Sequence, residues 1–288
     1  MNPPFFHHLP APLGSDTYSL LRRGIADDSE VSVYISAERD FAFLDPRPTF
    51  DYTRYRPRVQ SLGLSEYKVA SNVSAARLVK IAPLLDGATS FLEVGAADAA
   101  FLQVLHRAFP DLACATIEPD QNTRAARDVL PWLTQFSTPA EAKDYLADWV
   151  ALFHVFEHLE VPSEMLNALK SILGRDGRLL IEVPTLRDPL LSLYRAEAYE
   201  AFYFQRQHPY VYTAASLARV LDHNGYSVDQ IIPYQRYGLE NHLQWLTAGR
   251  PGGDPRFRNL FANLAEDYKR ALEADGTTDT VFVIARVM

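Results

Sequence analysis

Residues 90–101, "SFLEVGAADAAF", decide how the rest of the sequence is interpreted. An apolar run leads into Gly95, and small residues followed by an apolar helical pattern come directly after it. This order is typical of a strand, a tight turn and a helix that together bind a nucleotide. A loop that cradles phosphates usually has two or three glycines, whereas here Ala97 and Ala99 stand at the later positions. The stretch therefore predicts a βα unit but leaves its ligand open.

Segments with strand and helix patterns alternate along the rest of the chain. Strands are expected at 90–94, 112–118, 132–137, 148–155, 177–183, 226–233 and 280–287, and helices lie between most of them. This alternation predicts an α/β fold, with a seven-stranded, mostly parallel Rossmann-like sheet and helices on both faces. Ligands of such sheets bind at the carboxyl ends of the strands, where the chain reverses the strand order.

The chain divides into a core and several additions. Residues 1–64 are rich in proline and aromatic residues, show little periodicity and are expected to form an irregular N-terminal arm or lid. Residues 65–234 form the α/β core, in which 185–212 is an aromatic-rich insertion over the substrate. Residues 235–278 are a helical insertion ending in one amphipathic helix, and 279–288 supply the final strand of the core sheet.

Composition limits the partners. The formal net charge is −8, and no long Lys/Arg block is present, so a nucleic-acid partner is not expected. No apolar run approaches the roughly 20 residues that cross a bilayer, so stable membrane insertion is not expected either. The single cysteine, Cys114, and an N-terminus without signal-peptide character favour a cytoplasmic protein. The sequence leaves a homodimer as an alternative to a monomer, because the amphipathic stripe at 257–272 suits either a core or a dimer face.

Two carboxylates define the ligand more closely. Glu93, beside the glycine turn, would repel phosphates and attract a positive charge. Glu118 ends the next strand, where a carboxylate can accept hydrogen bonds from both ribose hydroxyls. A ligand with a ribose, a positive charge and no phosphate fits both residues, and S-adenosyl-L-methionine has these properties.

The sequence resembles the class I S-adenosylmethionine-dependent methyltransferases. The resemblance rests on "FLEVGAADAAFL", "ATIEPD" and "VALFHVFEHLEVPSEMLNALKSILGRDGRLLIEVPTL" in this order and covers about 65–288. More narrowly, it resembles a bacterial group with an "HVxEH" signature, and "QRYGLENHLQWLTAGRPGG" is similar to methyltransferases of surface-polysaccharide and sugar pathways. It implies cofactor contacts for Glu93, Gly95, Ala96, Ala97, Glu118, Pro119, Phe136 and Phe153.

Histidines and one glutamate form the candidate catalytic set. His154, Glu157 and His158 lie within one turn after the fourth strand, and His208 comes from the insertion that follows. A histidine can serve as the general base for a hydroxyl nucleophile, and His154 is placed beside the transferred methyl by the resemblance. Glu157 and His158 have an alternative role, in which they bond backbone groups and hold the loop.

A metal is a further alternative for these residues. Small-RNA and ubiquinone-pathway O-methyltransferases have a similar Glu-x-x-Glu-His element that binds a divalent ion, with His154 here in place of the first glutamate. With His208 as a further ligand, two or three imidazoles and one carboxylate would suit zinc, iron or manganese better than magnesium. A divalent metal is therefore an option, and no metal site is assigned.

The resemblance implies transfer of a methyl group to an acceptor. The expected acceptor is a hydroxyl of a sugar, a nucleotide-sugar or a surface glycan. C-methylation, a small natural-product acceptor, a dinucleotide-dependent oxidoreductase or epimerase, and a binding module without catalysis remain as alternatives.

Overall fold

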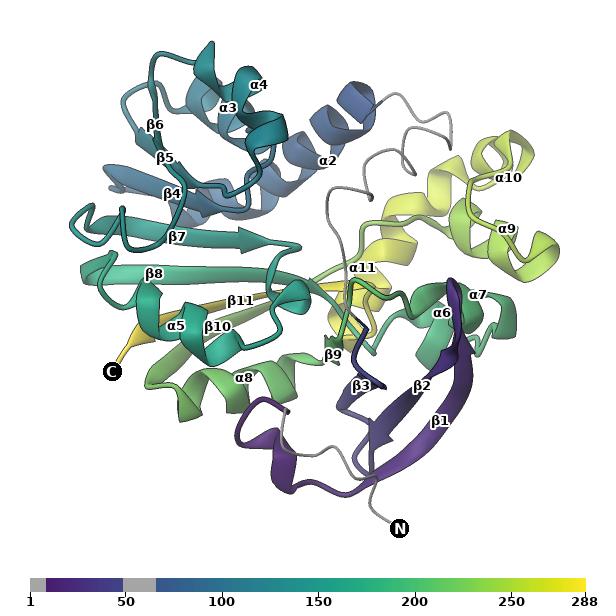
Figure 1. Cartoon of the computed structure of the whole chain (residues 1–288). Helices are drawn as coiled ribbons and strands as arrows, with labels where there is room; N and C mark the ends of the chain where they lie inside the picture. Colours follow the sequence, from purple (N-terminus) through teal and green to yellow (C-terminus); the bar gives the residue numbers. More distant parts are fainter. Residues whose placement is uncertain (1–8, 49–65) are drawn as a thin grey trace.

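The computed structural model describes residues 9–48 and 66–288, and their side chains except those of 66–71. Its larger sheet has seven strands in the order β10-β11-β8-β7-β4-β5-β6, which confirms the predicted seven-stranded sheet (Figure 1). Neighbours from β8 to β6 pair in parallel, whereas β11 is antiparallel to both β8 and β10. The strands are β4 (Ser90–Val94), β5 (Ala113–Ile117), β6 (Leu133–Phe136), β7 (Ala147–Phe153), β8 (Leu173–Pro184), β10 (Tyr226–Tyr234) and β11 (Thr280–Val287).

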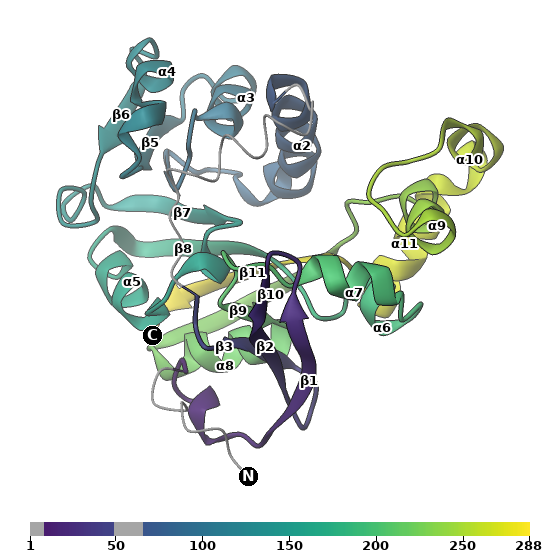
Figure 2. The ribbon, with the colours of Figure 1, turned by 45° about the vertical axis from the view of Figure 1, so that its right-hand side comes forward.

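Helices cover both faces of this sheet (Figure 2). Helices α2 (Glu66–Ile81) and α3 (Ala100–Ala108) pack on one face with α4 (Arg124–Asp128), and α5 (Pro162–Leu169) and α8 (Ala214–His223) pack on the other. The central strands are apolar on both faces because each face is covered: Phe91 points into the α2–α3 core and Leu92 into the α5–α8 core. Short 3₁₀ turns complete the connections: η2 (Leu13–Ser15), η4 (Ala82–Leu84), η5 (Gln121–Thr123) and η6 (Phe156–His158).

The N-terminal part is a second sheet, so the expectation of an irregular segment is wrong for residues 18–45. Strands β1 (Tyr18–Ile25), β2 (Asp28–Ser36) and β3 (Phe41–Asp45) pair antiparallel, and β9 (Tyr210–Tyr212) from the 185–212 insertion joins them as the fourth strand. Val31, Val33 and Ile35 alternate inward on β2, which is the period of a strand with one buried face. The Tyr- and Arg-rich stretch 50–58 lies outside the described residues.

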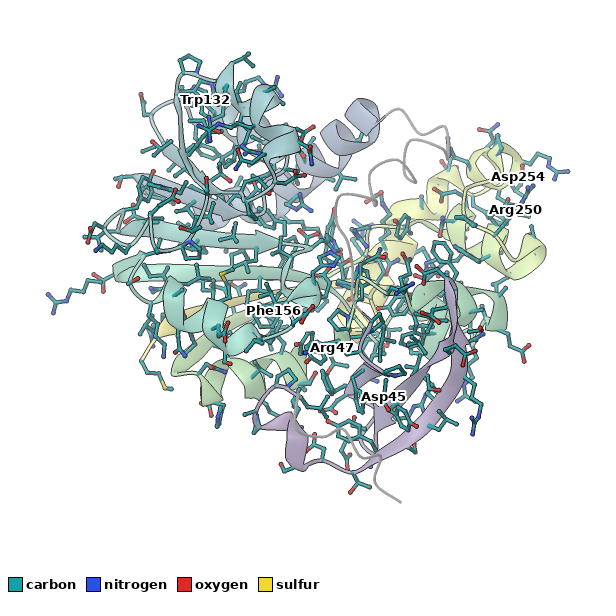
Figure 3. All side chains as sticks on the ribbon, viewed as in Figure 1. Asp45, Arg47, Trp132, Phe156, Arg250 and Asp254 are labelled. Atoms are coloured by element: carbon teal, nitrogen blue, oxygen red, sulfur yellow. The ribbon has the colours of Figure 1, made fainter. Side chains whose placement is uncertain are left out.

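The small sheet is attached to the segment that follows β7. Arg47, just after β3, lies between the two sheets in Figure 3, and its Nη1 donates to the carbonyl oxygen of Glu160 at 3.1 Å. The hydroxyl of Tyr210 on β9 donates to the same oxygen at 3.2 Å. Phe156 is fully buried against Tyr212, with ring centroids 5.6 Å apart. The segment after β7 therefore lies between the two sheets.

The two insertions are helical and mostly short. Helices α6 (Pro189–Ser192) and α7 (Glu197–Tyr203) precede β9, and α9 (Leu239–Ala248), α10 (Pro255–Leu260), η7 (Ala262–Leu264) and α11 (Ala265–Asp275) lie between β10 and β11. The prediction of one continuous amphipathic helix over 257–272 is wrong, because the chain breaks at Phe261 between α10 and η7. Leu260 and Leu264 are 73% and 51% exposed, so most of the expected apolar stripe is not a core.

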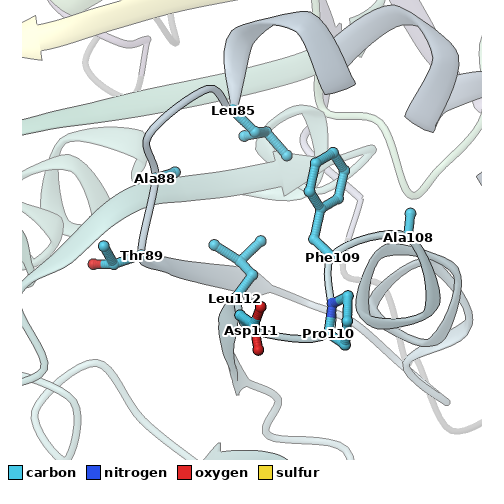
Figure 4. A pocket seen from close by; sticks show the side chains of 8 residues that line it. All are labelled: Leu85, Ala88, Thr89, Ala108, Phe109, Pro110, Asp111 and Leu112. Carbon is cyan, nitrogen blue, oxygen red and sulfur yellow. The ribbon is translucent and has the colours of Figure 1, made fainter.

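The carboxyl ends of the parallel strands mark the edge at which the fold places its ligands. The strand order reverses between β4 and β7, so the loops that follow these two strands lie side by side. A pocket at the opposite edge is formed where β4 and β5 begin, and it belongs to the helix–strand packing there (Figure 4). Its lining residues are Leu85, Ala88, Thr89, Ala108, Phe109, Pro110, Asp111 and Leu112.

Candidate active site

The turn after β4 requires left-handed backbone at three positions. Gly95, Ala97 and Ala99 have φ of +75°, +52° and +60°. At Gly95 a Cβ atom would also lie 2.6 Å from Cγ2 of Val155, in the loop after β7. Glycine is therefore needed at 95 for space and for conformation, and the two alanines hold a conformation that costs an L residue about 1–2 kcal/mol each. The loop keeps the shape of a glycine-rich turn although it has one glycine.

Glu118 holds this turn in place. Its Oε2 accepts from the backbone N–H of Ala97 at 2.7 Å, and its Oε1 accepts from that of Asp120 at 2.8 Å. From the other side, Nη1 of Arg127 donates to the carbonyl oxygen of Ala97 at 2.6 Å. Each carboxylate oxygen of Glu118 can accept a second hydrogen bond. The carboxylate can therefore support the loop and still accept from ribose hydroxyls.

Glu93 is buried beneath the turn and is 5% exposed. Its Oε2 has no hydrogen-bond partner among the described residues. Burial raises the pKa of Glu93 to about 8, the charge of Arg77 lowers it, and the charges of Glu118 and Asp98 raise it. The side chain is therefore largely protonated near neutral pH. The expectation of a standing negative charge at this position changes accordingly: the charge would develop when a cation binds.

The remaining predicted cofactor residues occupy different environments. Ala96 and Phe153 pack into the α2–α3 core, and the Phe153 ring lies against Phe101 with centroids 4.8 Å apart. Contacts of Ala96 and Phe153 with a cofactor would therefore come mainly from their backbone. Phe136, at the end of β6, is half-buried against Tyr145, and Pro119 is exposed beside Glu118. Both lie at the carboxyl edge, and their cofactor contacts stay predictions.

His154 follows β7 directly and has strained backbone, with φ of +53°. Such strain in a non-glycine residue costs about 1–3 kcal/mol and is concentrated at functional sites. Its Nδ1 is 3.0 Å from Oε1 of Glu157, and its Nε2 is 2.9 Å from Nη1 of Arg236. Because a guanidinium can only donate, Nε2 is the accepting nitrogen and Nδ1 carries the proton.

Glu182, on β8, lies on the other side of the same imidazole. Its Oε1 is 3.2 Å from Nε2 of His154 and has no hydrogen-bond partner among the described residues. Burial raises the pKa of Glu182, but the opposite effect of the charges of Arg77 and His154 is larger, and this pKa falls to about 2. Burial and the charge of Arg236 lower the pKa of His154, and Glu182 and Glu157 raise it, with a net rise. A proton arriving on Nε2 would therefore meet an ionised oxygen.

The structure brings all four predicted catalytic residues together. One ligand atom from each of Glu157, His158 and His208 lies within 4.8 Å of the others, and Glu157 also contacts His154. Nδ1 of His158 bonds the backbone oxygen of Gln207 at 2.7 Å, so the loop-holding role is present for His158. Burial lowers the pKa of His208 to about 3, so its imidazole is neutral.

Sequence reasoning missed the charged residues that surround His154. Glu182 interrupts the apolar run "RLLIEVP" on β8, and a buried carboxylate within an apolar strand is an available signal. Arg77, on α2, donates to Glu182. Asp279, directly before β11, accepts from Nε of Arg236 at 3.3 Å. These contacts join residues 43 to 105 positions apart, and no local pattern in the sequence indicates them.

Aromatic residues of the 185–212 insertion mainly form a core. Tyr199 and Tyr203 are buried with Trp245, and their hydroxyls donate to Oδ2 of Asp188 and the carbonyl oxygen of Thr185. They join the insertion to the small N-terminal sheet, whereas Phe202 is 42% exposed. This part of the chain therefore packs as a wall against the small N-terminal sheet.

A parallel α/β sheet with a glycine turn and a carboxylate after its next strand is consistent with the class I methyltransferase arrangement and also occurs in dinucleotide-binding sheets. The residues present suit S-adenosylmethionine: the turn has no room for a side chain at Gly95, and Glu93 has a buried oxygen without a hydrogen-bond partner among the described residues. A family model described as "Methyltransferase domain" matches residues 66–231, more than half of the chain. The chain belongs to this family and is an S-adenosylmethionine-dependent methyltransferase.

Solved structures support the fold. An S-adenosylmethionine-dependent methyltransferase from Archaeoglobus fulgidus is 16% identical, with a TM-score of 0.53 over 82% of this chain and 99% of that one. A possible histamine N-methyltransferase from Thermotoga maritima is 14% identical, with a TM-score of 0.51 over 81% and 96%. The mitomycin 7-O-methyltransferase MmcR is 14% identical, with a TM-score of 0.51 over 82% and 59%. A search of curated proteins gave no significant match. Among the helices in the described ranges, none is long and apolar enough to cross a membrane.

Proposed function

We propose that this methyltransferase methylates a hydroxyl group of a sugar, a nucleotide-sugar or a surface glycan in the cytoplasm, with His154 as the general base. One observation carries the assignment of the base: the unpartnered, ionised oxygen of Glu182 at 3.2 Å from Nε2 of His154. Attack by a hydroxyl requires removal of its proton during transfer, whereas a neutral amine attacks through its lone pair. A site prepared to accept a proton therefore favours O-methylation over N-methylation, and the acceptor panel separates O-methylation from C-methylation.

The cofactor side of the site is formed by the loops after β4 and β5. S-adenosylmethionine, when bound, supplies an electrophilic methyl group on a sulfonium. Gly95 and Ala97 give the turn that would face it, and Glu118 would accept from its ribose hydroxyls. Glu93 would balance its positive charge by losing a proton. These roles fit one positively charged nucleoside.

The acceptor side depends on the proton at His154. Glu157 holds Nδ1–H, which aims Nε2 away from the loop, as a carboxylate orients the histidine of a catalytic dyad. The acceptor hydroxyl would take the place of Nη1 of Arg236 at Nε2. After proton transfer, Nε2–H would donate to Glu182, which stabilises the imidazolium. General-base catalysis of this kind contributes about 10²–10⁴-fold.

The choice of a sugar hydroxyl rests on the resemblance of "QRYGLENHLQWLTAGRPGG" to methyltransferases of sugar and surface-polysaccharide pathways. Residues of this segment include Arg236, which contacts the proposed base, and Trp245, which is buried against the wall formed by α7. The segment is therefore close enough to the base to influence the acceptor.

The test is an assay of S-adenosylhomocysteine release with a panel of nucleotide-sugars, free sugars, phenolic natural products and carbon acids. We expect turnover with a sugar hydroxyl, and we expect His154→Ala to reduce kcat about 10²–10⁴-fold with little change in cofactor Kd. Turnover only with carbon acids or only with phenols would show that the acceptor is not a sugar hydroxyl. Equal kcat in His154→Ala and wild type would remove His154 as the base.

A further inference from the structure

Arg236 turns one edge of its guanidinium toward the proposed base. Its Nη1 is 2.9 Å from Nε2 of His154, and its Nε donates to Oδ1 of Asp279 at 3.3 Å. Nη2 makes no hydrogen bond within the described part of the chain, and the Arg236 side chain is 23% exposed. The edge formed by Nη1 and Nη2 therefore has donors left for a ligand, beside the place of the acceptor hydroxyl.

The surroundings of Arg236 fix the direction of this edge. Oδ2 of Asp279 accepts from the backbone N–H groups of Arg236 and Tyr237, both at 3.0 Å. The ring of Tyr237 lies against the guanidinium, with its centroid 5.3 Å from Cζ of Arg236. Asp279 is buried, so water does not compete for these contacts. The Nη1–Nη2 edge is therefore oriented before a ligand arrives, which lowers the cost of binding one.

Asp279 leaves much of the positive charge of Arg236 without a close partner. Its shortest contacts are with neutral donors, Oγ1 of Thr280 at 2.7 Å and Nε2 of Gln235 at 2.8 Å. Nε of Arg236, at 3.3 Å, is farther away than the donor of a close charge-assisted hydrogen bond. Burial lowers the pKa of Arg236, but the charges of Asp279 and Glu182 raise it by more, so the guanidinium stays a cation. Among the described residues, Asp279 is its one ion-pair partner.

The reaction would take the imidazole away from Nη1. When the acceptor hydroxyl bonds to Nε2 of His154, Nη1 of Arg236 loses that contact. After proton transfer, Nε2–H would donate to Glu182, so Nη1 does not regain it. A partly buried donor without a partner is destabilising, and a group on the acceptor next to the reacting hydroxyl can replace the imidazole. Carboxylates and phosphates suit this place best, because a guanidinium edge binds them through two parallel hydrogen bonds.

We propose that the acceptor carries a carboxylate or phosphate next to the reacting hydroxyl, and that Nη1 and Nη2 of Arg236 bind this anionic group. The proposal rests on the proposed function and narrows the acceptor to an acidic sugar. Because Nη1 and Nε2 of His154 are neighbours, the anionic group and the hydroxyl belong to adjacent ring carbons. A uronic acid has such a pair beside its carboxylate, and a sugar phosphate has one beside its anomeric phosphate.

The experiment compares acidic and neutral sugars by calorimetry on the full chain saturated with S-adenosylhomocysteine. The probes are D-glucuronate, α-D-glucose 1-phosphate and D-glucose. We expect wild type to bind at least one of the two acids about 10–100-fold more tightly than glucose. Binding of glucuronate alone would assign the edge to a carboxylate, and binding of the sugar phosphate alone would assign it to a phosphate.

Variants of Arg236 test whether this preference comes from the guanidinium. Arg236→Met should remove the preference, and Arg236→Lys should keep only part of it, because an ammonium has no planar edge. Arg107→Met is the control, since Arg107 is exposed at the end of α3, and it should keep the full preference. The preference is a ratio measured within one protein, so a general loss of folded protein does not change it. Circular dichroism and the Kd for S-adenosylhomocysteine would confirm that each variant is folded.

His154→Ala separates this proposal from the role of the base. This variant frees Nη1 of Arg236, so it should bind the acidic sugar at least as tightly as wild type while its turnover falls. Equal Kd values for both acids and glucose in wild type would overturn the proposal, even if a neutral sugar were methylated. A preference for acids that persists in Arg236→Met would overturn it as well. Acid binding that depends on Arg236, without turnover on any sugar, would support the anion site and contradict sugar O-methylation.

Discussion

Burial of Glu93 makes a measurable prediction for stability as a function of pH. The pKa of this carboxyl is about 8 in the folded protein, mainly because of burial, against about 4.5 when it is exposed. Between these values the folded state binds one more proton than the unfolded state. Stability therefore falls as the pH rises through this window, by about 1.4 kcal/mol per pH unit. Above the folded pKa the loss is complete, and below pH 4.5 it is absent.

Glu93→Gln removes this titration and keeps the shape of the protonated acid. Urea unfolding of both proteins at pH 5.5 and pH 7.5 isolates the effect, because all other groups titrate alike in the two proteins. Over these two pH units, wild type should lose about 2.5 kcal/mol relative to Glu93→Gln. A constant offset between the two proteins at both pH values would refute the argument that the buried acid is protonated in the folded state.

The same proton connects stability to cofactor binding. If the positive charge of S-adenosylmethionine ionises Glu93, binding at pH 7 should release close to one proton from wild type and none from this position in Glu93→Gln. Calorimetry in two buffers of different ionisation enthalpy measures that number. Affinity for the cofactor should accordingly rise with pH up to about 8 in wild type and stay flat in the variant.

Further predictions concern the turn after β4. Ala97→Gly should change the free energy of unfolding by less than about 1 kcal/mol in urea unfolding, because relief of the +52° φ offsets the added freedom of the unfolded chain. Ala76→Gly, on an exposed face of α2, is the control and should lower the free energy of unfolding by about 1 kcal/mol in the same assay. Gly95→Ala should lower the free energy of unfolding. Adding Val155→Ala to this variant should restore only the part of that loss caused by overlap of the new Cβ with the Val155 side chain. Glu118→Gln should weaken cofactor binding by about 1.5–3 kcal/mol in calorimetry, since an amide cannot accept both backbone N–H groups, and an unchanged Kd would contradict the ribose role.

The sheet was predictable because its strands are locally unambiguous. Runs such as "SFLEV" and "WVALF" are apolar on both faces, as a covered parallel strand must be, and their limits follow from the turns beside them. The small N-terminal sheet was missed because only β2 alternates clearly, and its fourth strand, β9, comes from a distant part of the chain. The break at Phe261 was missed because an apolar stripe at helical spacing does not show where the helix ends.

The predicted catalytic residues lie close together, but their environment could not be derived from the sequence. His154, Glu157 and His158 are neighbours in the chain, so their proximity is local. Arg236 and Glu182, which set the proton on His154, come from other elements and reach it only through the pairing of β7 with β8 and of β10 with β11. Burial decides the rest: the sequence shows Glu93 as a carboxylate, and the folded protein makes it a neutral acid.

The antiparallel last strand explains why the additions gather at one edge of the core. Because β11 runs opposite to β8, Thr280 at its start pairs with Pro184 at the end of β8 and with Tyr234 at the end of β10. The 185–212 and 235–278 insertions therefore both emerge at the carboxyl edge, where β9 also attaches the N-terminal sheet. The proposed cofactor side is built from two short loops of the core, whereas Arg236 and His208 reach the other side from the two insertions and lie there with Glu182 of β8. Differences in acceptor among proteins with this core should accordingly follow the insertions, and grafting 235–248 between two such enzymes should move acceptor preference without changing cofactor Kd.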